Sequence, residues 1–132
     1  MENLISKEVA QNEVNRWLDS KRIGGKKRIA YEKTIEELVS YVEDGTLILN
    51  ENNTWVHKLL FPIESEKTTS ELVYKNRLNV DEVTNGLKGA DGSPQDMVKC
   101  YVSLLTGKVK GIINKLDTQD YSVCQSISVF FL

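Results

Sequence analysis

The sequence has one histidine, two cysteines and no apolar run approaching the roughly 18 residues that a membrane-spanning helix needs. Its opening, MENLISKEVAQ, also lacks the basic flank and the apolar stretch of a signal peptide. We therefore expect a cytosolic protein with no membrane partner. Cys100 and Cys124 each lie in an apolar helical pattern, which predicts reduced, buried thiols, with a disulfide as the less favoured alternative.

Metal-binding and catalytic motifs are equally scarce. A zinc site needs more ligands than this sequence clusters. His57 lies between Val56 and Lys58 in a strand pattern, where a lone histidine is expected to be a surface or half-buried strand residue and not a ligand or a base. The glycine-rich segment GLKGADG, residues 86–92, lacks the G-x-x-x-x-G-K-[ST] order of a phosphate-binding loop.

The acidic residues do not indicate catalysis either. Three acidic pairs have sufficient explanations as helix caps or as solvated faces: Glu36 and Glu37, Asp81 and Glu82, and Asp117 and Asp120. The sequence therefore predicts a protein that is not an enzyme and that binds no cofactor and no metal.

Opposite charges nearly cancel, with 17 Lys and Arg against 19 Asp and Glu. This balance predicts no global field that attracts nucleic acid or an anionic membrane. The basic run KRIGGKKR, residues 21–28, is a local exception, and with two helices and a β-hairpin it is also consistent with a winged-helix DNA-binding protein. We favour a solvated linker, because acidic residues on the second helix would repel DNA: Glu32, Glu36, Glu37, Glu43 and Asp44.

Periodicity predicts two N-terminal helices, over residues 4–19 and roughly 28–43. The pair Gly24 and Gly25 separates them, and Gly45 ends the second. The second helix places apolar residues at i, i+3, i+4 and i+7, as on a face that packs on a core: Ile35, Leu38, Val39 and Val42.

The period then changes to that of strands. The segments TLIL, TWVHKLLFPI and SELVYKNRL are rich in β-branched, aromatic and apolar residues, and the turn signals NENN and ESEKTT separate them. These features predict three strands in an antiparallel meander. Pro62 cannot donate to a ladder, so we expect it near the end of its strand or on an edge.

Residues 79–132 predict about four short helices with clear starts and stops. Asn79 and Glu82 match a capping box, Ser93 and Pro94 open the next helix, Gly107 ends it, and Asp117 caps the last. The expected fold class is α+β. Residues 1–45 form an N-terminal helical extension, and residues 46–132 a domain of a small antiparallel β meander and a C-terminal bundle of short helices.

From about residue 55 to residue 132 the order of parts resembles a known family. The parts are VHKLLFPI, a polar turn, TSELVYKNRLNVDEV, LKG, a variable loop, LLTGKVKGIINKLDTQDY and the aromatic end VFFL. This arrangement resembles the tail assembly chaperones of long-tailed bacteriophages, of the Mu-like type. Residues 1–45 have no counterpart in the usual short form of that family.

The resemblance implies a chaperone that coats the tape-measure protein, helps recruit tail tube subunits and can self-associate. It also implies a location in the host cytoplasm and absence from the mature virion. In that family a longer product often arises by ribosomal frameshifting, and the ending Phe130, Phe131 and Leu132 can be encoded by a slippery run of uridines.

Apolar residues of the short helix and of the C-terminus are the candidate partner-binding set: Val109, Ile112, Ile113, Phe130, Phe131 and Leu132. These segments have more apolar residues than one core face needs, although core positions explain Ile112, Leu116 and Phe131 equally well. Two other functions stay open, a winged-helix-like DNA-binding protein and a structural virion or tail completion protein. We expect nucleic acid to be the less favoured partner.

Overall fold

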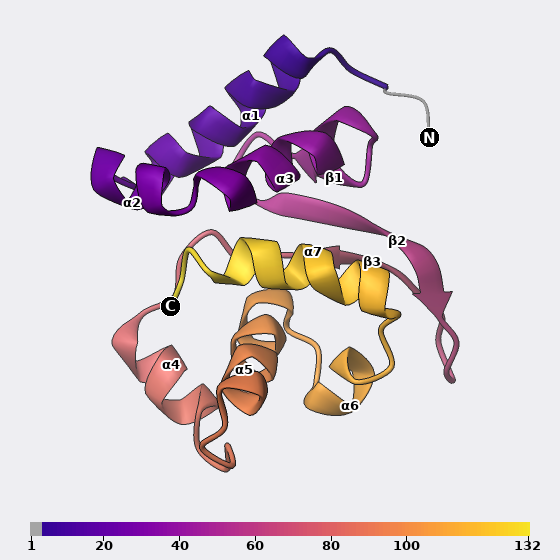
Figure 1. Cartoon of the computed structure of the whole chain (residues 1–132). Coiled ribbons are helices and arrows are strands. Elements are labelled where there is room, and N and C mark those ends of the chain that lie inside the picture. Colours follow the sequence, from indigo (N-terminus) through magenta and orange to yellow (C-terminus); the bar gives the residue numbers. More distant parts are fainter. Residues whose placement is uncertain (1–3) are drawn as a thin grey trace.

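The computed structural model describes residues 4–132, so the first three residues of the predicted N-terminal extension lie outside the described part. The fold is α+β, with helices at both ends of the chain and a three-stranded antiparallel sheet between them (Figure 1). This confirms the predicted fold class.

The N-terminal part has three helices, α1 (Lys7–Ser20), α2 (Gly25–Ala30) and α3 (Glu32–Glu43). Ser6 caps α1, because its hydroxyl accepts a hydrogen bond from the Val9 N–H. The predicted helix over 28–43 is thus two helices, which meet at Tyr31, where the backbone leaves the α conformation (φ −109°, ψ 26°). Gly45 follows α3 with φ +83°, as its role as a stop requires.

The sheet has the strand order β1-β2-β3, with β1 (Leu47–Leu49), β2 (Trp55–Ile63) and β3 (Thr69–Val73). This is the predicted meander. The pairing of β2 with β3 shifts register between Lys58 and Ile63, so β2 carries an irregular segment there. Pro62 lies in this segment, one residue before the end of β2, as predicted.

Four helices complete the chain, α4 (Val80–Gly86), α5 (Pro94–Thr106), α6 (Lys110–Ile113) and α7 (Thr118–Ser128). The N-caps of α4, α5 and α7 are those that the sequence predicts. Asn79 and Glu82 form a capping box, Ser93 caps α5, and the Asp117 side chain accepts from the Gln119 N–H at the start of α7. Gly107 ends α5 with φ +70°.

One hydrophobic core connects the two ends of the chain. It includes Trp17 of α1, Leu38 of α3, Leu72 of β3 and Phe130 beyond α7. The rings of Trp17 and Phe130 meet edge to face, with centroids 5.5 Å apart. Packing therefore continues across the predicted boundary at residue 45, and the N-terminal helices share their core with the rest of the fold.

Candidate partner-binding groove

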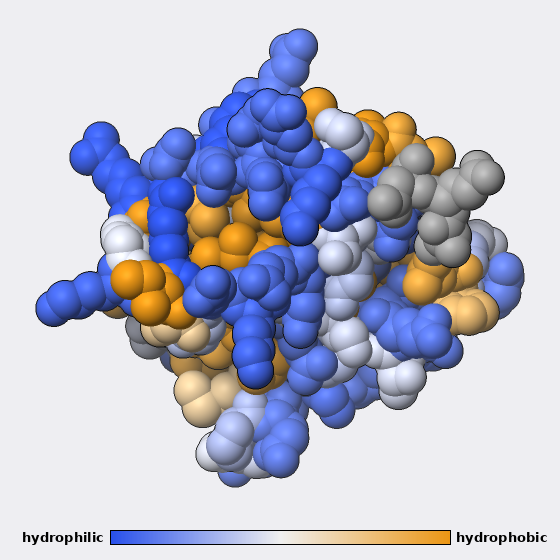
Figure 2. All heavy atoms as spheres, turned by 45° about the horizontal axis from the view of Figure 1, so that its top comes forward, coloured by the Kyte–Doolittle hydropathy of each residue, from blue (hydrophilic) through white to orange (hydrophobic). Residues whose placement is uncertain are grey.

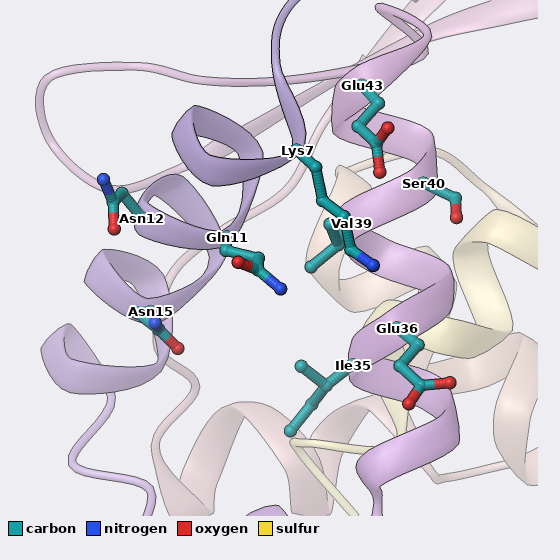
Figure 3. Close-up of a pocket in the computed structure, with 9 residues that line it drawn as sticks. All are labelled: Lys7, Gln11, Asn12, Asn15, Ile35, Glu36, Val39, Ser40 and Glu43. Atoms are coloured by element: carbon teal, nitrogen blue, oxygen red, sulfur yellow. The ribbon is translucent and has the colours of Figure 1, made fainter.

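A groove of about 580 Å³ lies between α1 and α3, within the range of about 300–1,000 Å³ that is typical of ligand sites. In the space-filling view, hydrophobic atoms lie at the bottom of a hollow on this side of the molecule, and hydrophilic side chains surround it (Figure 2). The nine residues that line the groove come from these two helices alone (Figure 3). It is thus a feature of how α1 packs on α3.

The floor of the groove is apolar and its walls are polar. Ile35 and Val39 point from α3 towards α1, and Gln11 points back from α1 (Figure 3). Lys7 extends from the start of α1 across the upper part of the groove towards α3, and Glu36 lies on the α3 wall. An apolar stripe with charge at its edges is the surface that an amphipathic helix fits.

Helical periodicity explains this lining. Lys7, Gln11 and Asn15 follow one another at intervals of four on α1, next to the edge that buries Ala10 and Val14. Polar residues so close to a buried edge leave Ile35 of α3 only partly covered, whereas Val39 is buried. Ile35 accordingly remains half-buried, although it packs against the core.

The predicted partner-binding residues do not form one surface. Ile113 and Phe130 are buried in the core and present no surface to a partner, and Ile112 and Phe131 are half-buried. Val109 and Leu132 are exposed, by 69% and 53%. Residues 109–113 precede α7 and residues 130–132 follow it, so the two groups lie at opposite ends of this helix (Figure 1).

The C-terminal Phe131 covers a lysine. The Lys21 Nζ lies 3.5 Å from the centroid of the Phe131 ring and donates a hydrogen bond to the Asn76 carbonyl oxygen at 2.8 Å. Burial, together with the positive charges of Arg77 and Lys27, lowers the pKa of Lys21 to about 8. Basic side chains of the run at residues 21–28 therefore gather with Arg77.

The prediction of a surface or half-buried His57 is wrong, because this side chain is completely buried. Its Nδ1 lies 2.9 Å from the Tyr74 hydroxyl oxygen, which is 3.0 Å from the Sγ of Cys124. Its Nε2 has no hydrogen-bond partner and lies 3.5 Å from an oxygen of Asp120. The period of a strand was a usable sequence signal, because side chains two positions apart lie on the same face, so His57 shares the face of the buried Trp55.

Asp120 also differs from the prediction of a capping or solvated-face residue. It is completely buried, and its two carboxylate oxygens accept hydrogen bonds from the backbone N–H groups of Leu60 and Phe61, at 2.9 and 3.0 Å. Two consecutive N–H groups point to the same side because β2 is irregular here. Asp120 thus connects α7 to β2. Its carboxylate accepts hydrogen bonds from two backbone N–H groups of β2 that lie beyond the pairing with β1.

This polar cluster connects α7 to β2 and to the residue after β3, and its side chains are shielded from solvent. Burial lowers the pKa of His57 against the opposing effect of Asp120, raises that of Tyr74 well above its ordinary value, and raises that of Cys124 to about 12. Both Cys100 and Cys124 are free and buried, which confirms their prediction as reduced thiols.

Within residues 4–132, His, Cys, Asp and Glu side chains form no group of three or more that could hold a metal ion. No helix in this part of the chain has both the length and the apolar character needed to cross a bilayer. Comparisons of the chain with protein-family models, with curated proteins and with solved structures found no match.

Proposed function

We propose that this chain is a phage tail assembly chaperone, which binds amphipathic helical segments of the tape-measure protein in the groove between α1 and α3. The observation that carries the proposal is the groove itself, an open surface with the apolar floor of Ile35 and Val39 and polar walls. The resemblance in the order of sequence parts gives the partner, and the groove gives the mode of binding.

Helix-in-groove binding needs an apolar stripe on the partner and little else. A tape measure is a long helical protein with repeated apolar stripes, which need temporary cover before the tail tube encloses them. Contacts with one groove of this size are expected to be weak. Several copies along one partner gain by multivalency and still allow release, after which the chaperone stays in the host cytoplasm and not in the mature virion.

Recruitment of tail tube subunits needs a second surface, which is available at the same time. Val109 is exposed at the start of α6, remote from α1 and α3 in the fold (Figure 1). It is the member of the predicted set that we assign to this contact.

The test is co-expression with the tape-measure-like product of the neighbouring gene, followed by affinity capture and sizing. We expect a complex with several copies of the chain per partner. Gln11→Trp fills the groove and should abolish capture, whereas Lys33→Trp, an exposed position of α3 outside the groove, should leave it unchanged. An insoluble partner beside a chain that stays alone would contradict the proposal.

A nucleic-acid-binding function is the second candidate, and one observation favours it. Lys21, Lys27 and Arg77 are close enough for the latter two to lower the pKa of Lys21. The exposed acidic residues of α3, Glu32, Glu36 and Glu37, act against it. Neutralising Lys26, Lys27 and Arg28 should weaken salt-dependent binding to duplex DNA if this candidate holds, and should leave tape-measure capture intact if the first does.

Mass spectrometry of purified virions tests the third candidate function, that of a structural virion protein.

A further inference from the structure

The outer face of the sheet carries two cross-strand pairs of different character. Val56 of β2 lies opposite Val73 of β3, and the next outward pair along the same strands is Lys58 opposite Glu71. The Lys58 Nζ and a Glu71 carboxylate oxygen are 2.5 Å apart, and both side chains are about half exposed. Ile48 of β1 lies beside Val56 and extends the apolar row to all three strands.

This face is open, whereas the other face is covered. Leu47, His57 and Leu72 are buried on the inner side, where His57 meets Asp120 of α7. On the outer side, Ile48 and Val73 leave 49% and 48% of their surface exposed. Together with Val56, which is half-buried between them, these side chains form a contiguous apolar patch across three strands, which indicates an interaction surface.

We propose that a second copy of this chain packs on the outer face, sheet against sheet. A twofold axis parallel to the strands and midway between β2 and β3 exchanges the positions of the two strands. Because Val56 pairs with Val73 and Lys58 with Glu71, this axis places Val56 over the second copy's Val73 and Lys58 over the second copy's Glu71. Val56 and Val73 of each copy then meet a valine of the other copy, and Lys58 and Glu71 each meet the opposite charge.

Charge complementarity favours a second copy of the chain as the partner on this face. The face has one exposed cation and one exposed anion at equivalent distances from the axis, so it is complementary to itself. A uniformly charged partner would meet repulsion from one of the two.

The dimer interface and the proposed tape-measure site are separate surfaces. The dimer uses the outer face of the sheet, whereas the tape-measure groove is lined by α1 and α3. Failure of one proposal therefore leaves the other standing, and sedimentation of the isolated chain tests the dimer without any partner.

The experiment compares the natural chain with Lys58→Glu, Glu71→Lys and an equimolar mixture of the two, by sedimentation equilibrium. The natural chain should double its mass as its concentration rises. Each variant places like charges across the twofold axis, so we expect its dimer Kd to rise about tenfold or more. In the mixture, position 58 of one variant meets position 71 of the other with opposite charge, so a heterodimer should form with a Kd within about threefold of the natural value.

In the mixture, each variant chain still lacks its own ion pair between positions 58 and 71. Any recovery of the dimer therefore reports the contacts between the two copies. Val73→Lys should also abolish the dimer, and Val80→Lys, at an exposed valine of α4, is the matched control. Circular dichroism confirms that each variant is folded. A chain that is monomeric at all concentrations, a dimer indifferent to Val73→Lys, or a mixture that does not re-associate would each overturn the proposal.

Discussion

An oxygen of the Asp120 carboxylate lies 3.5 Å from the Nε2 of His57, and both side chains are completely shielded from solvent. The two residues come from α7 and β2, which the chain brings together from distant positions. A buried carboxylate is costly unless hydrogen bonds compensate for its lost hydration. Here the N–H groups of Leu60 and Phe61 supply that compensation.

The first prediction concerns Asp120→Asn. The amide group keeps one acceptor oxygen but turns an NH2 group towards the second backbone N–H, so one buried donor loses its partner. We expect the free energy of unfolding to fall by about 2 to 3 kcal/mol. Urea unfolding measures it. Asp117→Asn is the control, because asparagine caps helices as well as aspartate does. Equal losses in the two variants would show that the Leu60 and Phe61 contacts carry no stability.

The second prediction is a stability loss in weak acid. Burial holds the pKa of His57 below its ordinary 6.5 in the folded chain, so the unfolded chain takes up the proton first as the pH falls. The contribution of His57 is fully present above pH 6.5 and declines below it, with a slope of up to about 1.4 kcal/mol per pH unit. His57 is the sole histidine, so His57→Gln should remove the slope between pH 6.5 and 5. A slope that persists in the variant would assign it to other groups.

Several helix boundaries could be predicted from the sequence, because their causes are local. Asn79 with Glu82, Ser93 with Pro94, and Asp117 each act within one helical turn, and Gly45 and Gly107 adopt positive φ where a glycine is needed. The break at Tyr31 was not predicted, because the apolar period of residues 35–42 gave no signal for the segment before it.

The buried polar cluster could not be predicted, because its contacts are not local. The Leu60 N–H and the Asp120 carboxylate are 60 positions apart in the chain. An aspartate three residues after an N-cap is also typical of the first helical turn, where its negative charge interacts favourably with the helix dipole. The sequence pattern is the same for either role. Only the packing of α7 against the irregular part of β2 decides between the two.

The groove between α1 and α3 escaped prediction for a similar reason. Its floor residue Val39 was assigned to the core face, and the structure does bury it. The polar residues Gln11, Asn12 and Asn15, which line the other wall, were a usable signal, since they adjoin the apolar edge of α1. Their meaning depends on how far apart the two helices pack, which periodicity does not give.

The third prediction separates core from surface at the C-terminus. Phe130 packs edge to face on Trp17 and contacts Tyr31 in the same way, so Phe130→Ala should lower the free energy of unfolding by about 3 to 5 kcal/mol. Leu132→Ala, at an exposed position two residues later, should change it by less than about 0.5 kcal/mol. Thermal and urea unfolding measure both. A Phe130→Ala variant as stable as the Leu132→Ala control would remove this ring from the core.

The fourth prediction concerns thiol reactivity. Burial raises the pKa of Cys124 to about 12 from its ordinary 9.0, which makes its thiolate fraction at pH 8 about a thousandfold smaller than that of an ordinary thiol. Iodoacetamide should therefore leave Cys124 unmodified in the native chain and alkylate it after denaturation, as mass spectrometry of peptides can follow. A cysteine introduced by Ser122→Cys, at an exposed position of α7, should react in the native state. Equal rates at positions 122 and 124 would mean that α7 detaches from the sheet on the timescale of labelling, and that the contact of Cys124 with Tyr74 does not close this part of the core.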